Sequence, residues 1–245
     1  MFDLTGRTAL VTGAGQNVGA GIARTLAGQG ASVVVNDLFD DRARSVADGI
    51  NAAGGSAVVA TFDVTDLDAV TAAITTIGRV DILVNNAGIS GTERMTPRPF
   101  REMTPDDWRM PIDINLFGVM HCCHAVIEGM CERQWGRIIT ISSGAGTAGV
   151  AIGVSPYSAG KGGGIAFTRT LALEVARTGV TANTLALGLM DNPDPTVTAR
   201  LVRAIPVGRT GTPADIGAAC AWLASEEASW VTAQTINING GSITS

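Results

Sequence analysis

The sequence predicts an α/β fold: one domain over residues 1–245, built on a doubly wound sheet of seven parallel strands with helices on both faces. Three observations support this prediction. Short Val- and Ile-rich runs alternate with longer helical patterns along the chain, as βαβ units require. Several runs are apolar throughout, such as Val33-Val34-Val35, which is typical of strands covered on both faces. With 245 residues, 46% of them hydrophobic, the chain is long enough for one well-buried core.

The elements follow each other in a regular order. Runs rich in β-branched residues predict strands at 8–12, 31–37, 57–63, 82–86, 137–142, 180–186 and 235–239. The longer patterns between them predict helices at 19–29, 42–53, 67–77, 106–132, 157–177 and 214–224. Pro111 lies inside the fourth helix and is expected to kink it. Right-handed crossovers in such a sheet direct ligands to the carboxyl ends of the strands.

Composition narrows the class of partner. The net charge is -5, and the sixteen arginines form no run that would make a phosphate-binding stripe, so a nucleic-acid surface is not expected. The first residues enter an apolar strand without a basic segment before it, and we expect no apolar run close to the roughly 18 residues that span a bilayer. We therefore expect a cytoplasmic protein that acts on a small molecule.

The cysteines and histidines do not predict a metal site. Cys122, Cys123, Cys131 and Cys220 show neither CxxC nor zinc-type spacing, which favours buried, reduced thiols over disulfides. His121 and His124 are three residues apart on an expected helix, but no acidic or histidine partner lies near them in the sequence. A packed helix face is the better interpretation, and we expect no metal.

The only tyrosine and the only lysine of the chain are four residues apart, in Tyr157-Ser158-Ala159-Gly160-Lys161. On a helix, this spacing places both side chains on one face, one turn apart. A fixed cation beside a phenol favours the phenolate and lowers the phenol pKa, toward the range in which a general acid or base works. An arbitrary pair with this spacing is usually a surface feature, so its meaning depends on the residues around it.

The first strand ends in a glycine-rich turn, residues 12–21, that leads into a helix. Gly13, Gly15 and Gly19 permit close approach of a ligand to the backbone, and the helix N-terminus offers free N–H groups to a pyrophosphate. The position of this cluster directly after the first strand predicts a dinucleotide site.

Asp37 closes the second strand, twenty-four residues after Gly13. A dinucleotide fold has its ribose-binding acid near this position, and a carboxylate there would repel a 2′-phosphate. We therefore expect NAD, with NADP less favoured. Asp37 could instead cap the following helix, and Arg42 and Arg44 lie close enough in the sequence to keep NADP open.

Taken together, these motifs identify a family. The chain resembles the short-chain dehydrogenases/reductases, of the single-domain type with a YxxxK motif, over essentially its whole length. The residues that carry the resemblance stand in the family's order: Thr12-Gly13 to Gly19, Asp63-Val64, Asn85-Asn86-Ala87-Gly88, Asn115, Ser143, Tyr157 to Lys161, Asn183 and Gly240-Gly241. The resemblance implies a Rossmann-type fold and an enzyme that acts on CH–OH donors with NAD(P).

The resemblance also implies roles for individual residues. Tyr157 would be the general acid/base, Ser143 would bind the substrate oxygen, Lys161 would hold the nicotinamide ribose, and Asn115 would support a water next to Lys161. The implied cofactor-binding residues are Gly13, Gln16, Asn17, Val18, Asp37, Asp63, Val64, Asn86, Gly88, Tyr157, Lys161, Gly188 and Asn192. Ser142 competes with Ser143 for the serine role, and the position after the Ile-Thr-Ile strand favours Ser143.

Four departures from the family pattern need an explanation. Asn17 stands at a turn position that usually has glycine or alanine, and asparagine tolerates a positive φ best among the other residues. In the stretch from Leu187 to Asn192, the usual proline is missing. The segment 188–205 is short and 91–101 is long, so we expect an open substrate pocket with the longer loop as its opposite wall. Finally, four glycines surround Lys161.

We interpret that glycine cluster, Gly160, Gly162, Gly163 and Gly164, as a close-packed subunit contact. Each glycine costs a helix interior about 0.8–1 kcal/mol relative to alanine, so four require a compensating contact. We expect a homotetramer or homodimer through the helix at 157–177, with packing onto the chain's own sheet as the alternative.

The leading functional hypothesis is an NAD-dependent oxidoreductase that interconverts a secondary alcohol and a ketone. Two alternatives stay open. One is an NADP-dependent carbonyl or 3-oxoacyl reductase, against which Asp37 argues. The other is a dinucleotide sensor without catalysis, although Asn115, Ser143, Tyr157 and Lys161 are all present. The substrate depends on irregular loops and cannot be read from these motifs.

Overall fold

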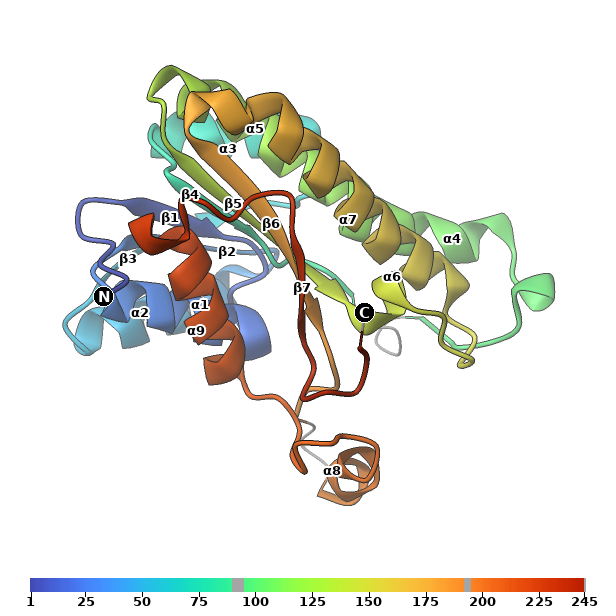
Figure 1. Cartoon of the computed structure of the whole chain (residues 1–245). Helices are drawn as coiled ribbons and strands as arrows, with labels where there is room; N and C mark the ends of the chain where they lie inside the picture. The colour runs from blue at the N-terminus through green and yellow to red at the C-terminus, as the bar shows by residue number, and fades with distance from the viewer. Residues whose placement is uncertain (90–94, 192–194, 245) are drawn as a thin grey trace.

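The computed structural model describes residues 1–89, 95–191 and 195–244. Its sheet has seven parallel strands in the order β3-β2-β1-β4-β5-β6-β7 (Figure 1). The strands are β1 Thr8–Val11, β2 Ser32–Asp37, β3 Ser56–Thr61, β4 Ile82–Asn85, β5 Gly136–Ser143, β6 Val180–Leu187 and β7 Thr235–Ile238. The strand order reverses between β1 and β4, so the carboxyl ends of these two strands border the crevice where such sheets bind ligands. The predicted doubly wound fold is confirmed.

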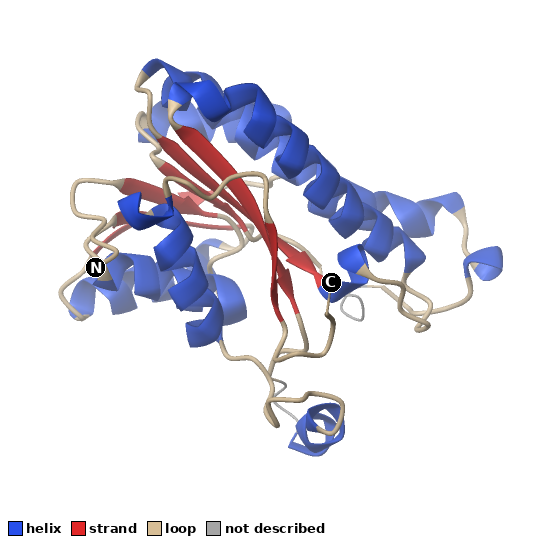
Figure 2. Ribbon diagram, viewed as in Figure 1, coloured by secondary structure: helices blue, strands red, loops and turns tan. Residues whose placement is uncertain are grey.

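Helices cover both faces of the sheet (Figures 1 and 2). One layer consists of α1 Asn17–Gly28, α2 Asp40–Ala52 and α9 Pro213–Ala224. The other contains α3 Leu67–Ile77, α5 Gly118–Glu132 and α7 Ser155–Val175. The remaining helical segments are η1 Phe100–Glu102, α4 Pro105–Ile112, η2 Asp113–Phe117, α6 Gly144–Thr147, η3 Ala176–Thr178, α8 Pro195–Val202 and η4 Glu226–Ala228.

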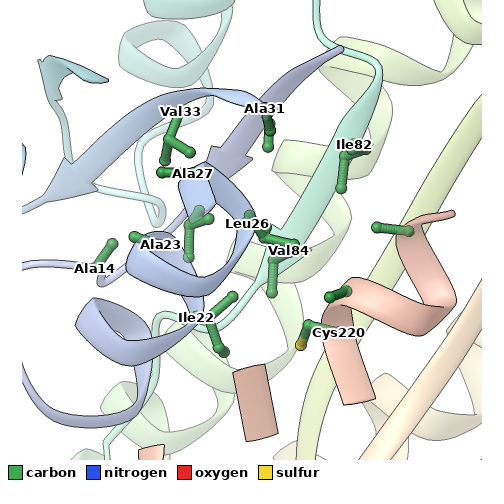
Figure 3. Close-up of a cluster of buried hydrophobic side chains, with 14 of the residues drawn as sticks. Ala14, Ile22, Ala23, Leu26, Ala27, Ala31, Val33, Ile82, Val84 and Cys220 are labelled. Carbon is green, nitrogen blue, oxygen red and sulfur yellow. The ribbon is translucent and has the colours of Figure 1, made fainter. Parts of the chain in front are cut away.

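Each helix layer has its own apolar core, because successive strand residues point to opposite faces of the sheet. Val33 and Val35 join the core beneath α1 and α9, whereas Val34 joins the core on the opposite face. Figure 3 shows the first of these cores, where Leu26 of α1 and Cys220 of α9 lie near Val84 of β4. This packing fixes α1 against the sheet, and therefore fixes the turn that precedes it.

The predicted helix at 106–132 is interrupted. Pro111 has no backbone N–H, and the helix changes to a π-helical segment, η2, directly after α4. The α-helix resumes at Gly118. A proline thus does disturb the helix, and the interruption places Asn115 inside the π-helical segment.

Residues 105–132 are long and apolar enough to cross a membrane by length and composition alone, contrary to the expectation from the sequence. The core helix of a globular protein passes the same test. Here α4 packs against α7, and α5 packs against α3, α7, β4 and β5. These contacts bury 39% of the most apolar window of this helical stretch.

All four cysteines are free thiols. Cys122, Cys123 and Cys220 are buried, and burial raises their pKa above the ordinary thiol value, so they are neutral packing residues. Cys131 is half-buried. The Nδ1 of His121 donates to the Val64 carbonyl at 3.0 Å, and His124 is exposed. Within the described residues, no cluster of ligands able to hold a metal is found.

Candidate active site

The candidate active site is centred on Tyr157 and Lys161, one turn apart on α7. Pro156 lies in the first turn of this helix, where a missing N–H costs no hydrogen bond. Lys161 is buried, and its Nζ donates to the carbonyl of Ile141 on β5 at 2.8 Å. Burial lowers the pKa of Lys161 to about 8. The ammonium is therefore anchored to the sheet beneath α7.

Two serines end β5, and the structure gives them different surroundings. Ser142 is buried, and its hydroxyl donates to the Lys161 carbonyl at 3.1 Å, so it holds α7 against the sheet. Ser143 is half-buried, accepts from Ala145 N at 3.2 Å, and its hydroxyl interacts with Tyr157. The geometry therefore favours Ser143 as the serine beside the phenol.

The pKa of Tyr157 does not behave as the sequence predicted. Burial raises it above the ordinary value for a phenol, and the hydrogen bond with Ser143 lowers it by less. The sequence-based prediction that the Tyr157 pKa is lowered is therefore wrong when only the groups of the protein itself act on the phenol. Burial disfavours charge on the phenol and the ammonium alike.

Asn115 is buried in the π-helical segment η2. Its Nδ2 donates to the Pro111 carbonyl at 2.9 Å, while its Oδ1 has no hydrogen-bond partner in the described part of the chain. A Cβ added to Gly88 would lie 2.8 Å from this Oδ1 and 3.0 Å from Lys161 Nζ. The amide oxygen, the ammonium and the backbone after β4 thus converge on one point, and the amide oxygen is free to accept.

The glycines around Lys161 are accounted for inside the chain. A Cβ on Gly160 would lie 2.7 Å from the Pro111 carbonyl oxygen, and one on Gly163 would lie 3.1 Å from Leu116 Cδ2. A Cβ on Gly162 would lie 3.3 Å from the Gly146 carbonyl oxygen, and one on Gly164 would lie 3.4 Å from that of Asn115. The subunit-contact interpretation of these glycines is corrected: they let α7 approach α4, η2 and α6. The alternative, packing within the chain, holds, although helical segments are the nearest neighbours and the sheet is reached only at Thr140 of β5, 3.9 Å from a Cβ on Gly164.

This packing predicts that Gly160→Ala destabilises the protein by about 1–3 kcal/mol, the range for overpacking a tight contact. The Pro111 carbonyl is backbone and cannot move aside easily, so Asn115 should shift as well. Gly49→Ala is the matched control, because Gly49 is an exposed glycine of α2 with nothing within 4 Å of an added Cβ. It should stabilise by about 0.5–1 kcal/mol. Urea unfolding measures both; equal effects would contradict the close-packing account.

A cleft of about 990 Å³ opens at the carboxyl ends of β1, β2 and β4. Nine of the predicted cofactor-binding residues line it: Gly13, Gln16, Asn17, Val18, Asp37, Asp63, Val64, Asn86 and Gly88. Ser143, Tyr157 and Lys161 are not among its lining residues. Gly88 connects the two regions, since it lines the cleft and also lies against Asn115 and Lys161.

The turn before α1 has the geometry of an anion site. Gln16 is the N-cap residue of α1, and its side chain makes no capping hydrogen bond. The Gln16 side chain therefore leaves the first backbone amides of α1 uncapped. Asn17 has a φ of 47°, as expected for the substitution at this turn. A Cβ on Gly13 would lie 2.8 Å from Ala87 Cα, and this glycine has a φ of 59°. Uncapped amides at a helix N-terminus fit a pyrophosphate.

Asp37 is buried at the cleft wall, where both of its oxygens accept backbone amides. Oδ2 accepts from Gly15 N at 3.0 Å and Oδ1 accepts from Phe39 N at 3.1 Å. Arg42 also lines the cleft, with its guanidinium 4.4 Å from the centre of the Phe39 ring. Arg44 instead pairs with Asp40 at 2.7 Å. Arg42 and Arg44 were the two arginines that could favour NADP, and of these two only Arg42 lines the cleft.

Two asparagines hold this turn in place, and sequence reasoning missed one of them. Asn86 Nδ2 donates to the carbonyls of Thr12 and Gly13, both at 2.9 Å. Asn36, which was not singled out, accepts from Gly13 N at 3.3 Å and donates to Ala60 and Phe62. A polar residue after the apolar run Val33 to Val35 is the signal that would have pointed to it.

Of the two remaining predicted residues, Gly188 lies at the carboxyl end of β6. A Cβ on Gly188 would lie 2.7 Å from Asn239 Cα, so this glycine allows β6 to approach the end of β7. Asn192 lies outside the described residues. On the other side of the site, Arg98 N donates to the Gly153 carbonyl at 3.1 Å, which joins the loop before α4 to the loop after α6. The expected open pocket stays a prediction.

The residues present therefore fit a dinucleotide. The cleft has uncapped amides at one end and a carboxylate along its wall. Near the Gly88 end of the cleft, an amide oxygen without a hydrogen-bond partner among the described residues lies near the buried ammonium.

Comparisons with known proteins agree with this geometry. Residues 7–200 match the family model described as short chain dehydrogenase. The chain is 37% identical to the 3-oxoacyl-[acyl-carrier-protein] reductase FabG of Salmonella typhimurium, over 98% of both chains. It is also similar to a solved 3-oxoacyl-[acyl-carrier protein] reductase with bound NAD from Brucella melitensis, with a TM-score of 0.93 and 36% identity. That likeness covers 99% of this chain and 94% of the other.

A second solved relative is a gluconate 5-dehydrogenase from Burkholderia cenocepacia in complex with NADP and tartrate. Its TM-score is 0.90 and its identity 35%, and the likeness covers 98% of this chain and 96% of the other. Sequence, fold and site thus agree, and the chain is an oxidoreductase that belongs to the short-chain dehydrogenase family.

Proposed function

We propose that this oxidoreductase interconverts a secondary alcohol and a ketone with NAD, and that Tyr157 moves the proton. The observation that carries the proposal is the group formed by Tyr157, Ser143 and Lys161: a half-buried phenol, a hydroxyl in contact with it, and a buried ammonium one helical turn away. Neither a metal nor a covalent intermediate is needed for this chemistry.

When bound, the nicotinamide supplies a hydride acceptor or donor at its C4 and, in the oxidised form, a positive charge that favours the phenolate. Ser143 donates a hydrogen bond to the substrate oxygen. In alcohol oxidation, Tyr157 accepts the hydroxyl proton; in ketone reduction, it returns that proton to the developing alkoxide.

Lys161 and Asn115 support the phenol in this proposal. Below about pH 8 the Lys161 ammonium is charged. It lies one helical turn from Tyr157 on α7, and its positive charge favours the phenolate in this proposal. The Oδ1 of Asn115, which has no hydrogen-bond partner among the described residues, lies beside Gly88, as Lys161 Nζ does. It suits a bridging water next to Lys161.

A panel of secondary alcohols and ketones, each offered with NAD(H) and with NADP(H), tests the proposal through the absorbance of the reduced cofactor. Turnover of at least one alcohol or ketone is expected, with NAD preferred. Binding of either dinucleotide without turnover of any panel member would favour a sensor over an enzyme.

The preference for NAD rests on Asp37, whose carboxylate lines the cleft without a cationic partner among the described residues. Asp37→Asn keeps the shape and one of the two acceptor oxygens while removing the charge that repels a 2′-phosphate. We expect the ratio of kcat/KM for NAD over NADP to fall about tenfold or more, the effect of about 1.4 kcal/mol. An unchanged ratio would remove Asp37 as the determinant.

An NADP-dependent 3-oxoacyl reductase is the second candidate, favoured by two observations. Relatives at 36–38% identity are named 3-oxoacyl-[acyl-carrier-protein] reductases, and Arg42 lies at the cleft beside Asp37. Arg42→Ala separates the candidates: if Arg42 binds a 2′-phosphate, kcat/KM for NADP falls while that for NAD is kept.

We also propose a cytoplasmic homo-oligomer, a tetramer or dimer, that uses the exposed face of α7. With the glycines occupied inside the chain, this face includes Ala159, Ala166, Thr170 and Leu173, and the charged Arg169 and Glu174 are exposed beside them. Leu173 is 68% exposed, as large apolar contact residues are in a separated subunit. Light scattering at micromolar concentration is expected to give an oligomer that Leu173→Asp weakens; a monomer for the natural sequence would contradict it.

A further inference from the structure

The segment after β7 folds back across the active-site edge of the sheet. Gly240 and Gly241 have φ values of 62° and 86°, a left-handed pair that reverses the chain. Asn239 closes the turn: its Oδ1 accepts from Gly241 N and its Nδ2 donates to the Ile243 carbonyl, both at 2.9 Å. Figure 1 shows the last coloured segment of the chain running toward α6. The last described residues thus form an ordered turn.

Ile243, at the end of this turn, packs against Gly144, the residue after Ser143. A Cβ added to Gly144 would lie only 2.6 Å from Ile243 Cδ1, and 3.7 Å from the Leu187 carbonyl oxygen. Gly144 is therefore packed between the end of β6 and the terminal segment. The contact is made by the Cδ1 methyl, because the next carbon, Ile243 Cγ1, would be 3.9 Å away.

Gly144 needs such support, because it begins α6, a helix of four residues. One turn of helix does not hold its conformation by itself. The Ser143 hydroxyl caps this turn through Ala145 N and also interacts with Tyr157. A rotation at Gly144 would move Ala145 N away from Ser143 and remove the hydrogen bond that helps to orient the hydroxyl toward the phenol.

The same turn rests on the segment that follows α8. Val207 N donates to the Gly240 carbonyl at 3.1 Å, and a Cβ on Gly241 would lie 3.3 Å from Pro206. The terminal turn therefore bridges residues 206–207 and the start of α6, two parts of the chain that are distant in sequence.

We infer that Ile243 is a positioning residue, which holds Ser143 toward Tyr157 by packing its Cδ1 methyl on Gly144. The inference rests on the proposed function, because it deals with the same serine and phenol. Its test includes a measurement that does not depend on turnover.

The single tyrosine of the chain makes that measurement direct. Phenolate absorbance reports Tyr157 alone, and circular dichroism verifies that the protein stays folded over the alkaline range. Because Ser143 lowers the pKa of Tyr157, Ser143→Ala should raise it. Ile243→Ala should raise it in the same direction, while Ile243→Leu, which keeps a terminal methyl, should restore it. Thr244→Ala, at the exposed neighbouring residue, is the control and should leave the titration unchanged.

A methyl exchange sharpens the test. Gly144→Ala adds a methyl group only 2.6 Å from Cδ1 of Ile243, and Ile243→Val removes that Cδ1. Each single variant should raise the pKa of Tyr157, and the double variant Gly144→Ala/Ile243→Val should return it close to the natural value. A double variant whose effect is the sum of the two singles would overturn the inference.

Turnover gives an independent readout. Ile243→Ala should lower kcat about tenfold and leave the KM for the dinucleotide unchanged, because the cofactor-binding cleft is not touched. If the natural protein turns over no panel member, the proposed function fails, and the titration still decides the role of Ile243. An Ile243→Ala titration equal to that of the natural protein, or no shift in Ser143→Ala, would overturn the inference.

Discussion

Tyr157→Phe is expected to lower kcat by about a hundredfold to ten-thousandfold, the usual contribution of a positioned general acid or base. The variant loses only the hydroxyl, so the ring still fills its half-buried place on α7. NAD binding should be kept, because the cleft residues do not include Tyr157. A fluorescence titration with NADH and a turnover assay separate the two effects.

The variant has a built-in control. Since the chain has one tyrosine, Tyr157→Phe should also abolish the alkaline phenolate absorbance. Undiminished turnover in a variant that shows no phenolate signal would remove Tyr157 from the proton transfer.

Lys161→Met should be inactive and yet more stable than the natural protein at pH 7. Lys161 is buried, and its pKa falls from 10.5 to about 8, which corresponds to a cost of about 3 kcal/mol for keeping the ammonium charged in the folded state. Methionine has a similar length and no charge. The lost hydrogen bond to Ile141 offsets about 1 kcal/mol of the gain.

The pH dependence of this difference has a definite sign. Below pH of about 8, Lys161 is protonated in both the folded and the unfolded protein, so the full cost is present. Between about 8 and 10.5 the unfolded chain keeps the proton that the folded chain has lost, and the stability of the natural protein rises with pH. The advantage of Lys161→Met should therefore be largest near neutral pH and shrink toward pH 10.5.

Urea unfolding of both proteins across this range measures the effect. Ser142→Ala is a suitable comparison, because it removes the other hydrogen bond between β5 and this turn of α7 without changing charge. The quantity to compare is the free energy of unfolding of Lys161→Met minus that of the natural protein. A difference that is smaller at pH 7 than at pH 10 would contradict the buried-cation account.

Local patterns were sufficient to predict the sheet, and nine of the predicted cofactor-binding residues line the cleft. The run Val33 to Val35 is apolar because both faces are covered, and a glycine-rich turn after β1 has few other uses. The spacing of Tyr157 and Lys161 becomes an arrangement in space through helical geometry alone.

Features that depend on distant contacts were not readable in this way. Gly160 and its neighbours suggested an interface, because the sequence does not show that Pro111 and Leu116 lie against them. The rise in the Tyr157 pKa depends on how deeply the phenol is buried, which spacing does not encode. Ile243 contacts Gly144 across about a hundred residues of sequence.

The most direct test of the account is a titration of Tyr157 with and without saturating NAD, followed by phenolate absorbance. If Tyr157 is the proton-transferring group of a nicotinamide site, the added positive charge should lower its pKa by about one pH unit or more. In Asn115→Ala, which removes the free amide oxygen near Lys161, the lowering should be smaller. A Tyr157 pKa that is the same with and without bound NAD would contradict the assignment of the phenol to the reaction.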